Sequence, residues 1–280
     1  MRELYEKVAR NTSIFTTHTY STSFSLGIRT LAPSLREPIC AIYGFVRFAD
    51  EIVDTFHDMP QEELLNKFRT DTFEAIETGF SMNPILYSFQ KAVNQFNIDP
   101  SHIDIFLKSM EMDLSKQNYR QEELDSYILG SAEVVGLMCL HVFLDGKRDK
   151  YEELKPYAMR LGAAFQKVNF LRDLRNDVKE LGRTYFPGFD NDNFDHNTKK
   201  LIEQDIREDF EVARKGILML PRTSRLGVYL AYSYYLCLFK KIRSTTASTV
   251  MQKRIRVPNS RKMAILFFTY LRHKFNLIHP

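Results

Sequence analysis

The chain of 280 residues has no tryptophan, only three cysteines and no uninterrupted apolar run long enough to cross a membrane. Cys40, Cys139 and Cys237 lie far apart without a CxxC motif, which argues against a disulfide framework and against a zinc site. The longest nearly apolar stretch, residues 226–239, falls short of the roughly 20 residues that span a bilayer, so we expect a buried helix there. The opening residues MRELYEKVAR contain no apolar signal segment, and we expect a cytoplasmic protein.

Acidic residues are missing from the last quarter of the chain. Glu211 is the last of them, and residues 212–280 contain 14 lysines and arginines. This asymmetry indicates that the C-terminal part faces a membrane surface, a phosphorylated ligand or a nucleic acid, or that it complements the acidic part of the same domain. No basic and aromatic nucleic-acid motif is present, which argues against nucleic acid. We expect peripheral contact with an anionic membrane, at the inner face.

Helical periodicity dominates the sequence, and no segment alternates convincingly with period two. The 11 glycines and 10 prolines fall mainly between periodic segments. Loops are expected at residues 82–84, 98–101, 144–149, 185–197 and 257–260, with about eight helices between them and Ser101 as one N-cap. Because no linker or repeat divides the chain, we predict a single all-α domain over residues 1–280.

The segment AIYGFVRFADEIVD, residues 41–54, is apolar yet keeps several charges. On a helix, one stripe contains Tyr43, Arg47, Asp50 and Asp54. The other faces are mostly apolar, which is typical of an interior helix. Two carboxylates on one buried face repel each other unless a cation lies beside them or one is protonated. We favour a buried site over a strip that faces water.

Residues 161–187 repeat this arrangement. A second stripe contains Gln166, Asn169, Asp173 and Asp177. A solvated face is a stronger alternative here, since lysine and arginine side chains lie nearby. Two DxxxD stripes, each with an arginine (Arg47, Arg172), nevertheless favour Mg²⁺ held by carboxylates together with substrate phosphates. The arginines would bind phosphate oxygens bidentately.

The sequence resembles the squalene/phytoene synthase family, the head-to-head prenyltransferases. The resemblance covers essentially the whole chain and rests on the segments YSTSFSLG (20–27), YGFVRFADEIVD (43–54), YILGSAEVVG (127–136), LGAAFQKVNFLRDLRNDVKELGRTYFP (161–187) and RIRVPNSRK (254–262). A lone DxxxD is weak evidence, whereas the run Q-x-x-N-x-x-R-D-x-x-x-D-x-x-x-x-x-R-x-Y-x-P is very specific. The resemblance implies an all-α isoprenoid synthase fold with helices around a central apolar cavity.

The resemblance also implies roles for individual residues. The implied ligands of Mg²⁺, with Mn²⁺ as the alternative metal, are Asp50, Asp54, Asn169, Asp173 and Asp177. The catalytic group comprises these four aspartates with Tyr43, Arg47, Arg172 and Tyr234. Substrate contacts are expected from Tyr20, Ser21, Thr22, Ser23, Phe24, Tyr43, Arg47, Gln166, Arg172, Tyr234 and Arg254, with Asp113 from the segment SMEMDL as a further candidate. Tyr127 or Leu129 would line the cavity.

One position departs from the family pattern. Many relatives have His and Lys where this chain has Tyr20 and Thr22. Arg29 or the basic C-terminal segment is expected to supply the missing positive charge.

The implied reaction is the Mg²⁺-dependent condensation of two geranylgeranyl diphosphates to phytoene through a cyclopropyl diphosphate, the first committed step of carotenoid biosynthesis. Aromatic side chains would stabilise the carbocations; the candidates are Phe24, Phe45, Phe165, Phe170 and Tyr234. There is no dinucleotide fingerprint and no C-terminal anchor, so NADPH is not expected.

Three alternatives stay open. The first is a squalene or dehydrosqualene synthase that uses two farnesyl diphosphates, and the second is a terpene cyclase that uses one diphosphate. The third is a non-catalytic protein that binds prenyl diphosphates or a membrane surface. None of these readings requires a nucleic acid or an obligate protein partner.

Overall fold

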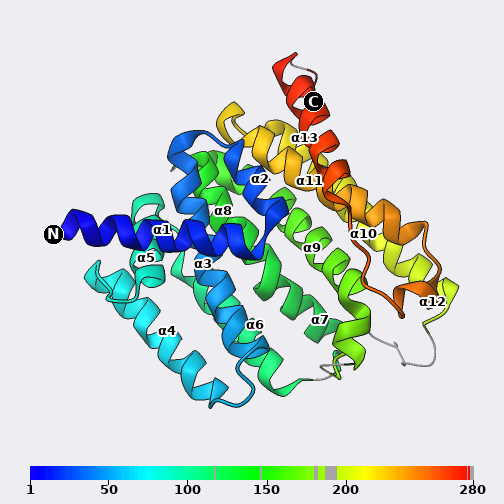
Figure 1. Cartoon of the computed structure of the whole chain (residues 1–280), viewed down its shortest axis with the longest axis horizontal. Coiled ribbons are helices and arrows are strands. Elements are labelled where there is room, and N and C mark those ends of the chain that lie inside the picture. Colours follow the sequence, from blue (N-terminus) through cyan, green and yellow to red (C-terminus); the bar gives the residue numbers. More distant parts are fainter. Residues whose placement is uncertain (117, 146, 180–181, 187–193, 276, 278–280) are drawn as a thin grey trace.

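The computed structural model describes residues 1–280 except 117, 146, 180–181, 187–193, 276 and 278–280, and it is helical throughout (Figure 1). The elements are α1 (Arg2–Tyr20), α2 (Thr22–Arg29), α3 (Pro33–Asp54), α4 (Gln61–Thr78), α5 (Pro84–Phe96), α6 (Pro100–Ser115), α7 (Gln121–Ile128), the π-helical turn η1 (Leu129–Glu133), α8 (Val134–Leu144), α9 (Arg148–Lys179), α10 (His196–Met219), α11 (Arg222–Arg243), α12 (Ala247–Val250) and α13 (Asn259–Lys274). The described residues contain no strand, only an isolated bridge between Asn118 and Thr184. The predicted all-α class is confirmed.

Several helices begin where the sequence has a proline. Pro33, Pro84 and Pro100 occupy the first helical positions of α3, α5 and α6, where a missing N–H costs nothing. The N-cap of α6 is Asp99, whose carboxylate accepts a hydrogen bond from the Ser101 amide at 2.8 Å. The prediction of Ser101 as N-cap is therefore wrong by two residues, because the proline fixes the start of the helix between them.

Two apolar cores flank the long helices α3 and α9. In the first core, α3 packs with α4, α5, α6 and α8, and the rings of Phe45 and Phe89 stack with their centroids 3.9 Å apart. In the second, α9 packs with α10 and α11 around Phe170, Phe210 and Phe239. With 32 residues, α9 is about 48 Å long, the longest helix in the described part of the chain.

Close packing of α9 against η1 depends on a glycine. A Cβ atom at Gly162 would lie 2.6 Å from the carbonyl oxygen of Ala132, which is well inside van der Waals contact. Gly162 therefore lets the two backbones approach, and this approach brings η1 and α8 to the side of α9 that carries the second polar stripe.

The helical run Gln121–Leu144, formed by α7, η1 and α8, is long and apolar enough to cross a membrane by length and composition, and it is the one such run in the described part of the chain. More than half of its most apolar window, 56%, is buried inside the fold. It packs against α6 and α9, as a core helix does. The stretch at residues 226–239 lies within α11, which also packs in the interior.

Candidate active site

A cavity of about 610 Å³ lies between α3 and α9, with further walls from α2, α8, α10 and α11. One end is lined by the charged residues of the two polar stripes, and the other by Leu140, Phe143, Leu154, Tyr157 and Leu220. Leu154 and Asp173 both line it from α9, and their separation along that helix corresponds to about 28 Å. The cavity is therefore long, with one charged end and one apolar end.

The α3 wall carries the first predicted stripe, and all four of its members line the cavity. Arg47 donates from Nη1 to Asp50 at 3.5 Å, and its Nη2 pairs with Glu51. The same guanidinium lies over the ring of Tyr20, 4.4 Å from the ring centroid. The Tyr20 ring therefore packs against the cation of Arg47 at the edge of this wall.

Burial controls the ionisation of the α3 wall. It raises the pKa of Asp50 to about 7, and repulsion from Asp54 adds to this shift while Arg47 opposes it. Burial likewise raises the pKa of Tyr43 to about 12, so its hydroxyl stays protonated at neutral pH. Without a bound cation, the carboxylates on this wall are only partly neutralised by Arg47.

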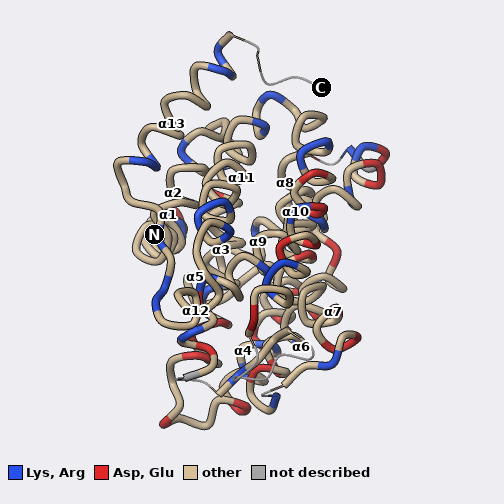
Figure 2. Tube along the Cα trace, turned by 90° about the vertical axis from the view of Figure 1, so that its right-hand side faces the viewer, with Lys and Arg blue, Asp and Glu red and all other residues tan. Residues whose placement is uncertain are grey.

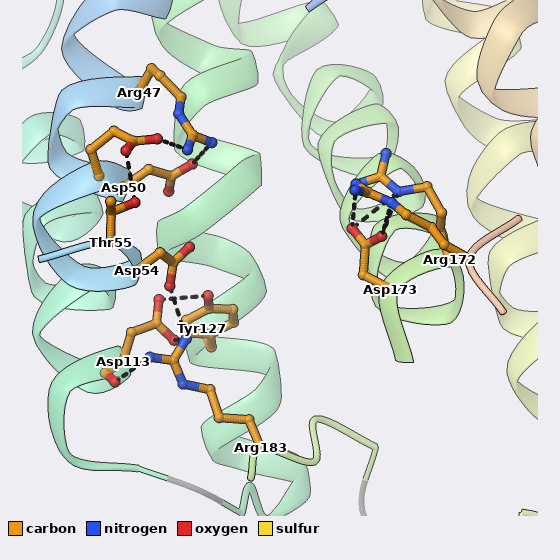
Figure 3. Close-up of polar contacts among 11 residues, drawn as sticks. Arg47, Asp50, Asp54, Thr55, Asp113, Tyr127, Arg172, Asp173 and Arg183 are labelled. Carbon is orange, nitrogen blue, oxygen red and sulfur yellow. Dashed lines mark hydrogen bonds and ion pairs between the residues drawn. The ribbon is translucent and has the colours of Figure 1, made fainter. Parts of the chain in front are cut away.

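The α9 wall carries the second stripe, and Gln166, Asn169, Asp173 and Asp177 all line the cavity. Two arginines converge on Asp173: Arg172 donates from Nε to both carboxylate oxygens at 3.0 Å, and Arg254 approaches from the segment before α13 to 2.6 Å. Figure 3 shows Asp173 and Arg172 facing Asp50 and Asp54 across open space.

The two walls act on each other electrostatically. Burial raises the pKa of Asp177 to about 7, and the further causes include repulsion from Asp173 on the same helix and from Asp54 on α3. A charge on one wall is therefore felt on the other. The four aspartates lie on facing walls of one cavity, as the two stripes require.

A buried cluster closes the charged end below Asp54 (Figure 3). Arg183 donates to Asp54 at 3.1 Å and to the backbone carbonyl of Asp113 at 2.7 Å, and its Nη1 lies 3.6 Å from the Asp113 carboxylate. Tyr127 donates to the same carboxylate at 2.8 Å. Asp113 and Tyr127 thus reach the cavity as expected. Arg183 was given no role from sequence, although it stands in the specific run of residues 166–187.

Residues 20–24 divide between the cavity and the outside. Tyr20, Ser21 and Phe24 line the cavity, and Ser21 also caps α2 by accepting from the Phe24 amide at 3.1 Å. Thr22 and Ser23, in the first turn of α2, do not line it, and their role as substrate contacts stays a prediction. Of the two expected sources of additional charge, Arg29 is exposed and does not line the cavity, whereas Arg254 of the basic C-terminal segment does.

Two of the predicted aromatic residues, Tyr234 and Phe45, lie away from the cavity wall. Tyr234 is buried but does not line the cavity; one residue further along α11, Tyr235 does, and its hydroxyl donates to Asn169 at 3.2 Å. One residue turns a helix by 100°, so the residue-by-residue match to the family selected the right helix and a neighbouring side of it. Phe45 belongs to the first core, and of the pair Tyr127 or Leu129 it is Tyr127 that lines the cavity, while Leu129 packs against the first core.

The donor set fits a hard divalent cation. In the part of the chain that the structure describes, no three His, Cys, Asp or Glu side chains gather around a single point. The aspartates instead stand on two facing walls, together with the Asn169 amide oxygen. These are oxygen donors, and their mutual repulsion remains incompletely neutralised, which suits Mg²⁺ or Mn²⁺ ions that take their remaining ligands from a phosphate and water.

Comparisons with known proteins agree with this geometry. A family model described as squalene/phytoene synthase matches residues 17–261. The chain is 28% identical to the 15-cis-phytoene synthase of Synechocystis sp., over 90% of this chain and 82% of that protein. It is also 28% identical to phytoene synthase 1 of Solanum lycopersicum, over 90% of this chain, and spans 65% of the length of that protein.

A solved structure supports the same assignment at the level of the fold. The structure of a dehydrosqualene synthase in complex with a ligand superposes with a TM-score of 0.82, covering 97% of this chain and 98% of that one, at 19% identity. The chain belongs to the squalene/phytoene synthase family.

Proposed function

We propose that this protein is a Mg²⁺-dependent prenyltransferase that joins two geranylgeranyl diphosphates head to head to give phytoene through a cyclopropyl diphosphate. The observation that carries the proposal is the long cavity with aspartates and arginines at one end and apolar side chains at the other. Such a cavity suits a ligand with an anionic head and a long hydrocarbon tail. The relatives named phytoene synthase support the choice of reaction.

The charged end would bind the diphosphate. Asp50, Asp54, Asn169, Asp173 and Asp177 would hold Mg²⁺, which would neutralise the diphosphate and make it a better leaving group. Three arginines, Arg47, Arg172 and Arg254, line the same end and would donate to phosphate oxygens. Because Arg172 and Arg254 already converge on Asp173, they are placed to move from a carboxylate to a phosphate oxygen with little displacement.

The middle of the cavity would protect the carbocations that form when the diphosphate leaves. The rings of Phe165 and Tyr235 stack at 3.9 Å, with Phe24 beside them, and all three line the wall. Aromatic faces attract cations by roughly 1 to 2 kcal/mol each when water is excluded, and they offer no nucleophile that would trap the cation.

The length of the substrate is the finer part of the proposal. The cavity extends about 28 Å along α9, which favours the C20 diphosphate over the C15 one. A squalene or dehydrosqualene synthase acting on farnesyl diphosphate is the second candidate. We further propose that the reaction needs no NADPH and takes place in the cytoplasm, without nucleic acid or an obligate protein partner.

The test is to give the purified protein C15 and C20 allylic diphosphates separately, with Mg²⁺ and without NADPH, and to measure pyrophosphate release and product mass. A C40 hydrocarbon from the C20 substrate is the expected result. A C30 product made only from the C15 substrate would support the second candidate, and a cyclic product from a single diphosphate would indicate a terpene cyclase. If no allylic diphosphate yields pyrophosphate, the protein binds such ligands without converting them.

A further inference from the structure

The outward face of α13 is apolar although it is exposed. Phe267, Phe268 and Phe275, in α13 and just after it, are 59%, 64% and 66% exposed. The opposite side, which includes Thr269, is turned inward where α13 packs against α11. A helix that lies against a protein in water normally has the reverse arrangement, with polar residues on its outer face.

Positive charges border this apolar face on both sides. At 100° per residue, Ala264, Phe267, Phe268 and Leu271 occupy a sector about 100° wide, whose centre lies about 150° around the helix from Thr269. Arg261 and Arg272 flank one edge of the sector, while Lys274 flanks the other, and α13 contains no acidic residue (Figure 2). This is the pattern of helices that lie in the plane of a membrane interface, with aromatic residues inward and lysine or arginine at the edges.

The charge of the surrounding chain selects an anionic surface. No acidic residue follows Glu211, and Lys253 and Arg256 are exposed just before α13. If two copies of the protein met through this face, the lysines and arginines of one copy would lie against those of the other. Their repulsion disfavours self-association. Lipid phosphates complement the cations, and the acyl region accepts the phenylalanine side chains.

The apolar face is close to the cavity through two connections. α11, against which α13 packs, lines the cavity with Gly227, Val228, Ala231 and Tyr235. Arg254, which precedes α13 by a few residues, pairs with Asp173. In both views α13 stands at the outside of the molecule, next to α11 (Figures 1 and 2).

We propose that α13 docks the protein on an anionic lipid bilayer, with Phe267, Phe268 and Phe275 at the boundary between headgroups and acyl chains and with Arg261, Arg272 and Lys274 against lipid phosphates. This inference stands apart from the proposed reaction, because vesicle binding is measured without substrate.

The experiment is cosedimentation of the full chain with phosphatidylcholine vesicles and with vesicles that also contain phosphatidylglycerol. We expect binding to the anionic vesicles only. The double variant Phe267→Ser, Phe268→Ser should lower the vesicle partition coefficient about a hundredfold. The triple variant Arg261→Gln, Arg272→Gln, Lys274→Gln should lower it by about fivefold for each cation removed. These side chains are exposed, so the melting temperature and helical circular dichroism should not change.

Matched controls come from α10. Leu201→Ser removes an apolar side chain that is 71% exposed, and Lys200→Gln removes its exposed cationic neighbour. Neither should alter vesicle binding. Because the chain has no tryptophan, Phe268→Trp introduces a single reporter whose emission should shift to the blue on anionic vesicles and be quenched by lipids with brominated acyl chains. Leu201→Trp should show neither effect.

Several outcomes would overturn the proposal. These are a wild-type protein that binds no vesicle, equal binding to neutral and anionic vesicles, and unchanged binding by the phenylalanine variant. A concentration-dependent dimer that Phe267→Ser, Phe268→Ser abolishes, in a protein that ignores vesicles, would instead assign the face to a second copy of the chain.

Discussion

The two ends of the cavity are built from opposite kinds of side chain. At the charged end, aspartates and arginines of α3 and α9 face each other, whereas the far end is closed by Leu140, Phe143, Leu154 and Leu220. The charged end can recognise a ligand through charge and hydrogen bonds, while the far end can do so only through shape and volume. The comparison teaches that changes of charge and changes of size should have separate effects in this protein.

The two ends are also held together differently. At the charged end, long-range pairs fix the carboxylates: Arg183 holds Asp54, and Arg254 holds Asp173. At the far end, close packing fixes the walls, and a Cβ atom at Gly216 would lie 2.2 Å from the Cβ of Tyr157. The charged end should therefore respond to loss of a charge even when the side-chain shape is kept.

The largest expected effect is at the two acidic walls. Asp54→Asn and Asp173→Asn keep the side-chain shape but each removes one negative charge from opposite walls of the cavity. If both walls share the cations and the diphosphate, each variant should slow pyrophosphate release by at least about 10³-fold. Asp71→Asn on α4, which removes the exposed partner of Lys67, is the control and should retain wild-type activity. A large loss for one wall and none for the other would contradict a shared site.

The next effect concerns stability rather than catalysis. Arg183 is 7% exposed and pairs with Asp54 and Asp113, so Arg183→Gln leaves the buried carboxylate of Asp113 without its cation. Breaking a buried pair typically costs about 3 kcal/mol of unfolding free energy, measurable by urea denaturation. Arg207→Gln, which breaks an exposed pair with Glu211 on α10, should cost less than about 1 kcal/mol. Equal losses for the two variants would show that Arg183 does not stabilise the charged end.

The charged end could largely be predicted from sequence, because it depends on helical spacing. Each stripe, from Tyr43 to Asp54 and from Gln166 to Asp177, reaches the cavity intact. Spacing within one helix fixes which residues share a face, so these positions needed no knowledge of the tertiary structure.

The site residues that the sequence did not identify are those whose position depends on contacts between helices. The pairing of Arg183 with Asp54 joins residues 129 positions apart, and no local pattern reveals it. Tyr234 and Tyr235 are neighbours in the apolar stretch of α11. Only the packing of α11 against α9 decides which of the two hydroxyls reaches Asn169. The predicted loop at residues 185–197 lies partly outside the described residues.

A change of size at the far end should shift the preferred substrate length. Ala158 lines the cavity from α9, about 22 Å along that helix from Asp173. Ala158→Phe should block the space beyond it and lower activity with the C20 diphosphate relative to the C15 one by about tenfold. Competition between the two substrates, followed by product mass, measures this ratio. Ala158→Ser, which barely changes the volume, should keep the wild-type ratio; an unchanged ratio in Ala158→Phe would mean that the tail does not reach this end.

The smallest expected effect comes from two histidines next to the far end. His102 hydrogen-bonds the hydroxyl of Tyr151 at 2.8 Å, and the ring of His141 lies against the ring of the same tyrosine, with the centroids 4.2 Å apart and the planes tilted by 36°. Burial lowers the pKa of His141 to about 4 and also lowers the pKa of His102. At both histidines the effect of burial is larger than the opposing attraction of the nearby Asp99 carboxylate.

Acid should therefore weaken this part of the fold through proton uptake on unfolding. An unfolded histidine titrates near pH 6.5, so between pH 6.5 and about 4 the unfolded chain binds a proton at His141 that the folded chain does not. The groups facing it, His102, Asp99 and Glu152, are included in that shift. The unfolding free energy should fall as pH is lowered through this window. The slope should correspond to the uptake of up to about one proton by His141 on unfolding. His141→Phe should reduce the slope relative to wild type. Identical slopes for wild type and His141→Phe would mean that water or a proton reaches His141 in the folded chain. The apolar end of the cavity would then contain more water than its apolar side chains indicate.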